Sequence, residues 1–282
     1  MIVAAALIAL VAVASVPVSA WVVTNNAIHP PHKAVGDAPV GAKEVTLDGA
    51  EGAAIAAWYL PPQRYAPMCP AGVVCTPPPS AVPGVVILHG ISSSREFMRD
   101  RIALFSDAGF AVLAIDLRGQ GESTGENTLG ELESQDALTA ADWLAQQPGV
   151  DGTAIALDGS SFGGMVALVA AAADPDIVAV VAESPSTNAE NAAGGGWLGD
   201  FGMWLHGIDG SEVDSVKAAA LLAGRPVMVV VGEQESSANA ETIVAASGGE
   251  LWIAPGGHTE APEIAPHEYA LRVVGFVSQA VN

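Results

Sequence analysis

Ser161 lies in a pattern that could make it a nucleophile. Gly159, Ser161 and Gly163 form a G-x-S-x-G sequence between the apolar run 154–157 and an alanine-rich stretch that predicts a helix. A serine exposed on so tight a strand-to-helix turn needs small neighbours, because larger side chains would collide with the strand or the helix. The Phe162 amide would then lie at a helix N-terminus, which favours a developing oxyanion. A glycine-rich turn without chemistry is the alternative, since the chain contains 31 glycines.

A histidine must accompany this serine, because a hydroxyl becomes a good nucleophile only when a base takes its proton. His258 follows the last predicted strand in the loop 255–258, and we favour it as the base. His267, at the start of the final predicted helix, is the competitor, although an exposed histidine near a helix terminus needs no catalytic role. The sequence therefore indicates His258 before His267.

A carboxylate should orient the histidine, and it should follow a strand that lies between Ser161 and His258 in sequence. Glu233 and Glu235 follow the predicted strand 227–231, and we favour Glu235 because the chain can turn back toward the histidine there. Glu183, after the preceding strand, is a third option. The alternative for Glu233 and Glu235 is that both are solvated loop acids.

A second oxyanion donor should come from the end of a neighbouring strand. Gly90 permits a sharp turn after the strand 84–88, which would aim the Ile91 amide inward. His89 precedes Ser161 and is expected to be a packed, hydrogen-bonded scaffold residue rather than the base.

The elements that must position these residues alternate along the chain from residue 43. Short apolar runs alternate with helical patterns, which predicts an α/β fold with a mostly parallel, eight-stranded sheet covered by helices on both faces. The predicted strands are 44–47, 53–60, 84–88, 111–115, 154–157, 177–182, 227–231 and 250–253, and the first two should form an antiparallel hairpin. The predicted helices are 95–108, 132–146, 165–173, 240–247 and 266–280, with a mixed region at 188–223. In such a sheet, reactive groups gather on loops at the carboxyl ends of strands, which is where the candidate residues fall.

The length of the chain limits the number of domains, and its charge limits the possible partners. The 282 residues lack an internal repeat or long linker, so we expect one domain at 43–282. A net charge of -21 with only 10 Lys and Arg leaves no basic patch for nucleic acid and disfavours anionic lipid headgroups. We therefore expect no nucleic-acid partner.

The N-terminal segment 1–23 is uncharged and about long enough to span a bilayer, which takes roughly 20 residues. It is interpreted as a transmembrane anchor or a cleaved export signal, followed by a linker at 24–42. A buried core helix is the remaining alternative. His29 and His32 in the linker are not expected to bind a metal. The catalytic domain is therefore expected to be membrane-anchored or exported, and extracytoplasmic.

Cys69 and Cys75 are the only cysteines, and they lie in a proline-rich insertion at 61–83. We expect a disulfide between them, worth about 2 kcal/mol, which persists only outside the reducing cytosol. Two free thiols are the alternative, and two ligands do not complete a zinc site.

Together these segments resemble the α/β-hydrolase superfamily, and within it the bacterial serine hydrolases with an N-terminal membrane segment, related to the serine aminopeptidase and dienelactone-hydrolase-like groups. The resemblance runs from about residue 45 to residue 277. It rests on residues 88–95, 116–123, 159–164, 231–235 and 255–258. It implies that Ser161 is the nucleophile, that His258 is the base, and that the Ile91 and Phe162 amides form the oxyanion hole. The family usually has Asp where this chain has Glu235, which shifts the carboxylate by about 1.5 Å.

The resemblance implies a serine-dependent hydrolase that cleaves carboxylic esters without a metal or organic cofactor. A peptidase or acyltransferase on the same triad is the alternative, and a noncatalytic binding protein of the same fold is another. The segment 116–123 is similar to a structural loop of the superfamily. The segment 188–223 is where the superfamily places its lid, which is expected to be short here, and its aromatic residues should either rim the site or pack on the sheet.

Overall fold

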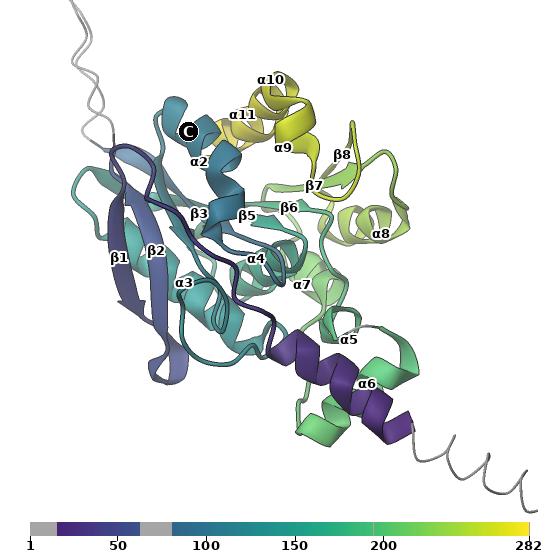
Figure 1. Ribbon diagram of the computed structural model, residues 1–282. Helices are drawn as coiled ribbons and strands as arrows, with labels where there is room; N and C mark the ends of the chain where they lie inside the picture. The colour runs from purple at the N-terminus through teal and green to yellow at the C-terminus, as the bar shows by residue number, and fades with distance from the viewer. Residues whose placement is uncertain (1–15, 63–80, 194, 282) are drawn as a thin grey trace, which may run out of the picture.

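The computed structural model describes residues 16–62, 81–193 and 195–281. Within them, a twisted sheet of eight strands is covered by helices on both faces (Figure 1). The predicted fold class is confirmed, and each predicted strand corresponds to an observed one. The strands are β1 (Lys43–Asp48), β2 (Ala54–Leu60), β3 (Val82–Leu88), β4 (Ala111–Ile115), β5 (Val150–Ser160), β6 (Ile177–Glu183), β7 (Val227–Gly232) and β8 (Glu250–Ala254).

The strand order is β1-β2-β4-β3-β5-β6-β7-β8. β1 pairs with β2 in antiparallel fashion, as the sequence predicts, and β2 pairs with β4 in the same way. All other neighbours are parallel. The carboxyl ends of β3 to β8 therefore share one edge of the sheet, where the loops after them can meet.

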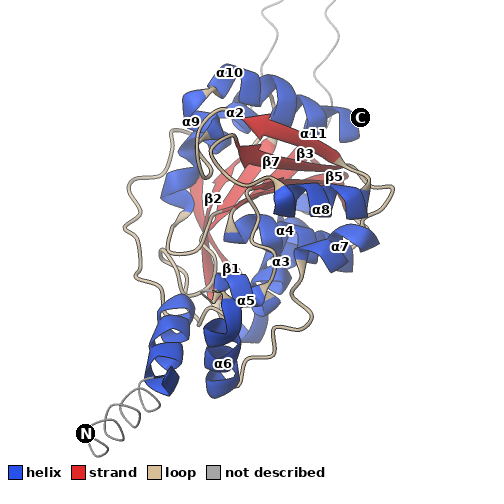
Figure 2. Cartoon of the chain, turned by 90° about the vertical axis from the view of Figure 1, so that its right-hand side faces the viewer, coloured by secondary structure: helices blue, strands red, loops and turns tan. Residues whose placement is uncertain are grey.

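The helices form two layers. The helical elements are η1 (Ala50–Gly52), η2 (Arg95–Met98), α2 (Arg99–Asp107), α3 (Glu131–Ala145), α4 (Phe162–Ala173), α5 (Ala189–Ala192), α6 (Gly196–His206), α7 (Ser215–Leu221), α8 (Ala238–Ser247), α9 (Ala261–Ile264), α10 (Pro266–Tyr269), the π-helical turn η3 (Ala270–Val274) and α11 (Gly275–Ala280). Helices α3, α4, α7 and α8 cover one face, and α2, α9, α10 and α11 cover the other (Figure 2). Successive residues of β3 alternate between the two layers: Val86 and Leu88 pack in the first core, and Val85 and Ile87 in the second.

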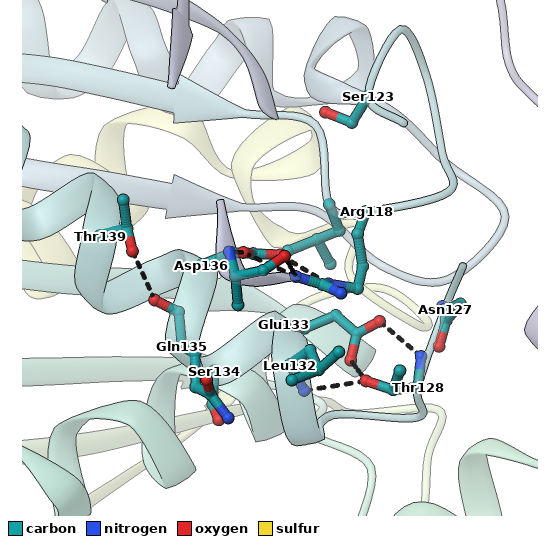
Figure 3. Close-up of polar contacts among 12 residues, drawn as sticks. Arg118, Ser123, Asn127, Thr128, Leu132, Glu133, Ser134, Gln135, Asp136 and Thr139 are labelled. Atoms are coloured by element: carbon teal, nitrogen blue, oxygen red, sulfur yellow. Dashed lines mark hydrogen bonds and ion pairs between the residues drawn. The ribbon is translucent and has the colours of Figure 1, made fainter. Parts of the chain in front are cut away.

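The loop after β4 is fixed to α3 by buried polar contacts, which Figure 3 shows. The Arg118 guanidinium donates to both carboxylate oxygens of Asp136 at 2.7 and 2.9 Å, and both side chains are buried. Glu133 accepts from the backbone amides of Thr128 and Gly130, which satisfies two N–H groups at the start of α3. Losing one partner of such a buried ion pair costs about 3–5 kcal/mol. These contacts give the loop a structural role.

Residues 16–28 form a helix that packs against α6 (Figure 1). The helix continues past residue 23, the predicted end of the N-terminal segment, and buries Ala27 and Ile28 in the core. Among the described residues, no helix is long and apolar enough to cross a membrane. Residues 1–15 of the predicted anchor or signal, and the predicted Cys69–Cys75 disulfide, lie outside the described residues.

Candidate active site

Ser161 occupies a strained turn between β5 and α4. Its φ and ψ are 54° and −116°, a conformation that residues other than glycine rarely adopt. A Cβ on Gly159 would lie 2.6 Å from the Gly164 nitrogen, and one on Gly163 would lie 2.6 Å from the His89 carbonyl oxygen. Glycine is therefore required on both sides of Ser161. The backbone of Gly159 contacts that of Gly163 and Gly164, and the backbone of Gly163 contacts that of Leu88 and His89, so neither position has room for a side chain.

Ser161, His258 and Glu235 form one chain of hydrogen bonds. Ser161 Oγ lies 2.9 Å from His258 Nε2, and His258 Nδ1 lies 2.7 Å from Glu235 Oε1. Because a carboxylate can only accept, Nδ1 carries the proton and Nε2 is left to accept from the serine hydroxyl. The three side chains come from loops after β5, β8 and β7, so the parallel edge of the sheet brings them together.

The second oxygen of Glu235 is also held. Oε2 accepts a short hydrogen bond from Ser184 Oγ and lies 3.3 Å from the Gly232 amide. Burial acts to raise the pKa of Glu235, but the hydrogen bonds from Ser184 and His258 outweigh it, so the pKa of this carboxyl lies below its usual range. Ser184 follows β6 with a φ of 45°. The sequence reasoning missed it, although its place directly after a strand was the available signal.

The competing candidates lie elsewhere. Glu233 is exposed, and His267 is exposed on α10. Glu183 is buried and forms an ion pair with Arg101 instead of facing the histidine. In the described part of the chain, the side chain of His258 forms hydrogen bonds with Ser161 and Glu235.

The loop after β3 lies against the serine, where a Cβ on Gly90 would be 3.3 Å from Ser161 Cβ. His89 Nδ1 lies 2.7 Å from the Gly90 carbonyl oxygen, and the Leu117 amide donates to His89 Nε2 at 2.9 Å. His89 is thus a neutral scaffold residue, and burial lowers its pKa. The Gly90 carbonyl points to His89, so the Ile91 N–H of the same trans peptide points the opposite way. Among the described residues, the Ile91 and Phe162 amides have no backbone acceptor.

A buried charge cluster supports the turn from beneath. Arg101 of α2 donates to Asp158 Oδ1 at 2.7 Å and to the Tyr269 hydroxyl at 2.7 Å, and also pairs with Glu183. Burial raises the pKa of Asp158, against the effect of Arg101. The Ser161 amide donates to the Glu183 carbonyl oxygen at 2.7 Å, which links the cluster to the turn. The sequence analysis did not predict this cluster.

Ser161 and His258 line a cavity of about 520 Å³. The rest of its lining comes from the loop after β3, from η2 and α2, and from residues 259–263, and it includes the exposed acids Asp100, Glu260 and Glu263. No described residue of the predicted lid segment 188–223 lines this cavity; several of them line a separate cavity of about 700 Å³. Trp197 and Trp204 do not line this cavity, and both are exposed, so they neither rim the serine nor pack on the sheet. Among the described residues, no cluster of His, Cys, Asp or Glu could hold a metal ion.

The sheet, its two helical layers and the serine turn define an α/β-hydrolase. Residues 51–226 match the X-Pro dipeptidyl-peptidase (S15) family, and the chain belongs to this family. The matched region includes Ser161 and ends before Glu235 and His258.

The chain also resembles other proteins in sequence and in fold. The chain is 32% identical over 104 residues to an uncharacterised 31.7 kDa protein of Escherichia coli, and the match spans 36% of each chain, about a third of that relative's length. Two solved structures share the fold. An esterase of Pyrococcus furiosus is 21% identical, with a TM-score of 0.69 over 90% of this chain and 100% of that one. An acetyl xylan esterase of Paenibacillus is 20% identical, with a TM-score of 0.66 over 94% and 93%.

Proposed function

We propose that this chain is a serine hydrolase that cleaves carboxylic esters through an acyl-enzyme on Ser161. The observation that carries the proposal is the continuous hydrogen-bonded chain from Ser161 Oγ through His258 to Glu235. Its geometry matches the requirements of nucleophilic catalysis: a serine hydroxyl, a base within hydrogen-bond distance, and a carboxylate that orients the base.

In the proposed reaction, Ser161 Oγ attacks the ester carbonyl carbon while its proton passes to His258 Nε2. The amides of Ile91 and Phe162 receive the oxyanion, and Glu235 stabilises the imidazolium. His258 then gives its proton to the leaving alcohol as the carbon–oxygen bond breaks. Water then attacks the carbonyl carbon of the acyl-enzyme while its proton passes to His258 Nε2. His258 returns this proton to Ser161 Oγ as the acyl–oxygen bond breaks, which releases the carboxylic acid and the free serine. Every step uses only these side chains, backbone amides and water.

The test is the variant Ser161→Ala, compared with the wild type. We expect it to lose hydrolysis of p-nitrophenyl acetate and butyrate, with only background turnover left, because the nucleophile is gone. It should also lose labelling by a fluorophosphonate probe. Undiminished labelling of the variant would contradict the assignment, and no labelling of the wild type would favour a noncatalytic binding protein.

Peptide hydrolysis is the second candidate. The family match supports it, since the name of that family refers to removal of X-Pro dipeptides. The exposed carboxylates of Asp100 and Glu263 in the cavity lining also suit the cationic amino terminus of a peptide. An alanyl-prolyl-p-nitroanilide substrate, assayed beside the esters, distinguishes peptide hydrolysis from ester hydrolysis. A higher kcat/KM for the anilide than for the esters would favour the peptidase and contradict the esterase proposal. Acyl transfer is tested by adding an amine or alcohol to the assay and measuring whether it becomes acylated.

We also propose that the catalytic domain is held at a membrane, or exported, on the extracytoplasmic side. The uncharged N-terminal sequence and the paired spacing of Cys69 and Cys75 support this. Fractionation of expressing cells, followed by thiol labelling with and without reductant, tests both points. Recovery of the full chain from the cytosol with two free thiols would contradict them.

A further inference from the structure

Two helices present exposed aromatic and aliphatic side chains at one end of the molecule. Trp21 is 47% exposed on the helix 16–28, and Trp197 and Trp204 are 63% and 70% exposed on α6. Val18 and Val22 are exposed beside Trp21. We call these five residues the aromatic face. By contrast, Trp58 and Trp252 elsewhere in the described chain are 0% and 5% exposed.

The two helices form one packed unit. A Cβ on Gly202 of α6 would lie 2.6 Å from the Ala20 carbonyl oxygen, so the helix backbones are in close contact. The side chains of Ala20 and Thr24 are fully buried there. Trp21 stacks on His206 with ring centroids 5.4 Å apart, and His206 Nε2 donates to the Trp21 carbonyl oxygen at 3.3 Å. Figures 1 and 2 both show this pair at the end of the molecule opposite α10 and α11.

Both helices have one buried side and one exposed side. Along the first helix, exposed residues at 18, 21 and 22 alternate with buried ones at 20, 24 and 27. Along α6, exposed Trp197 and Trp204 lie seven residues apart, and the buried residues are at 199, 202 and 203. Each helix thus packs one side against the other helix and the protein body. The opposite side is exposed within the described structure and is mostly apolar, although in α6 it includes Asp200 between the two tryptophans.

The charge pattern indicates what covers this side. No Lys, Arg, Asp or Glu precedes Lys33, and Asp200 is the only such residue of α6. The uncharged residues 1–15 lead directly into the helix that bears Trp21. Tryptophan is enriched where a bilayer meets water, because its ring is apolar and its indole N–H can reach the headgroups. A second copy of the chain fits less well, since each would bring a net charge of -21.

We propose that the aromatic face lies in the interface of a lipid bilayer, so that α6 as well as the N-terminal helix contacts lipid. The acidic net charge implies that the headgroups are zwitterionic. The inference extends the proposed location from an N-terminal attachment to a defined face of the folded domain, and it does not depend on the reaction at Ser161.

The experiment uses the full chain in phosphatidylcholine vesicles whose acyl chains carry bromine, which quenches tryptophan fluorescence on contact. In the wild type we expect quenching relative to unbrominated vesicles. The double variant Trp197→Phe/Trp204→Phe should lose about two thirds of that quenching, because it removes two of the three exposed tryptophans. Phenylalanine at such exposed positions leaves the fold intact. The matched control is Trp143→Phe, on a half-buried residue of α3, which should leave the quenching unchanged.

Quenching that is equal in the wild type and the double variant would overturn the proposal, because only the N-terminal helix would then contact lipid. Absence of quenching in the wild type would also overturn it. Sedimentation would then distinguish a dimer, formed through the aromatic face, from a monomer in which residues 1–15 cover that face.

Discussion

Glu235 is held at both of its carboxylate oxygens, by His258 at one and by Ser184 and Gly232 at the other. A glutamate has one more rotatable bond than the aspartate that is usual in this superfamily, so it needs more contacts to hold one orientation. The Ser184 hydroxyl supplies such a contact from the neighbouring strand end. The longer side chain and its extra partner together place the carboxylate within reach of the imidazole.

Replacement of Glu235 by alanine should lower kcat by about 10³–10⁴-fold, because the imidazole loses the group that fixes its tautomer and stabilises its cation. Glu233→Ala is the matched control, since Glu233 belongs to the same loop and is exposed. Steady-state kinetics with p-nitrophenyl butyrate measure both variants. If only the Glu233 variant lost activity, the catalytic acid would be Glu233 and our assignment of Glu235 would be wrong.

The residues of the hydrogen-bonded chain could be chosen from the sequence because each follows a predicted strand, and such loops share one edge in a parallel sheet. Ser184 follows β6 and offered the same signal, although it was missed, whereas Arg101 could not be chosen. Arg101 lies 57 residues from Asp158 and pairs with it through the packing of α2 on the sheet, which no local pattern encodes. The available signal was two acids, Asp158 and Glu183, in otherwise apolar strands, because buried carboxylates require a cation.

At the scale of the elements, the contact of α4 with the end of β3 depends on Gly163. Gly163→Ala should destabilise the protein by about 1–3 kcal/mol and impair activity, because the added Cβ would overlap the Leu88 and His89 carbonyls. Gly275→Ala is the matched control, a helical glycine whose nearest neighbour would be 4.0 Å away, and it should stabilise by up to about 1 kcal/mol. Urea unfolding compares the two variants. Equal stability for both would show that the α4 contact can relax.

The Arg101 cluster makes stability depend on pH. Burial raises the pKa of Asp158, so the folded state keeps its proton to a higher pH than the unfolded state does. The free energy of unfolding therefore falls as pH rises from about 4 through the folded pKa. Asp158→Asn resembles the protonated form, and its stability relative to the wild type should rise over this range. Urea midpoints at several pH values measure the difference. A relative stability that falls with pH would mean that Arg101 keeps Asp158 ionised.

The strands could be predicted because apolar runs bounded by turn residues are local signals. The start of α4 was placed three residues late, at Met165, because the glycines after Ser161 do not favour a helix; the close approach to β3 imposes the helical conformation there. The packing of residues 16–28 on α6 was not predicted either. Periodicity shows which side of a helix is apolar, and it does not identify the partner.

The whole molecule carries a net charge of -21, and the exposed acids Asp100, Glu260 and Glu263 add to the negative field at the cavity that contains Ser161. Anionic substrates should therefore be repelled. We expect kcat/KM for p-nitrophenyl butyrate to exceed that for p-nitrophenyl hemisuccinate by about 10-fold at low salt, and the ratio to shrink in 1 M salt. The variant Asp100→Asn/Glu263→Gln should reduce the ratio. Equal rates at low salt would show that the field does not reach the reacting ester.

The order of the strands gives the serine one more property. Ser161 follows β5, near the middle of the sheet, and His258 follows β8, at its edge. Their hydrogen bond exists only when β6, β7 and β8 have all added to β5. A chemical probe that reacts only with an activated Ser161 therefore reports whether the sheet has formed as far as β8. The rate at which labelling recovers during refolding would time the docking of the last strand, at a residue 89 positions before its first residue, Glu250.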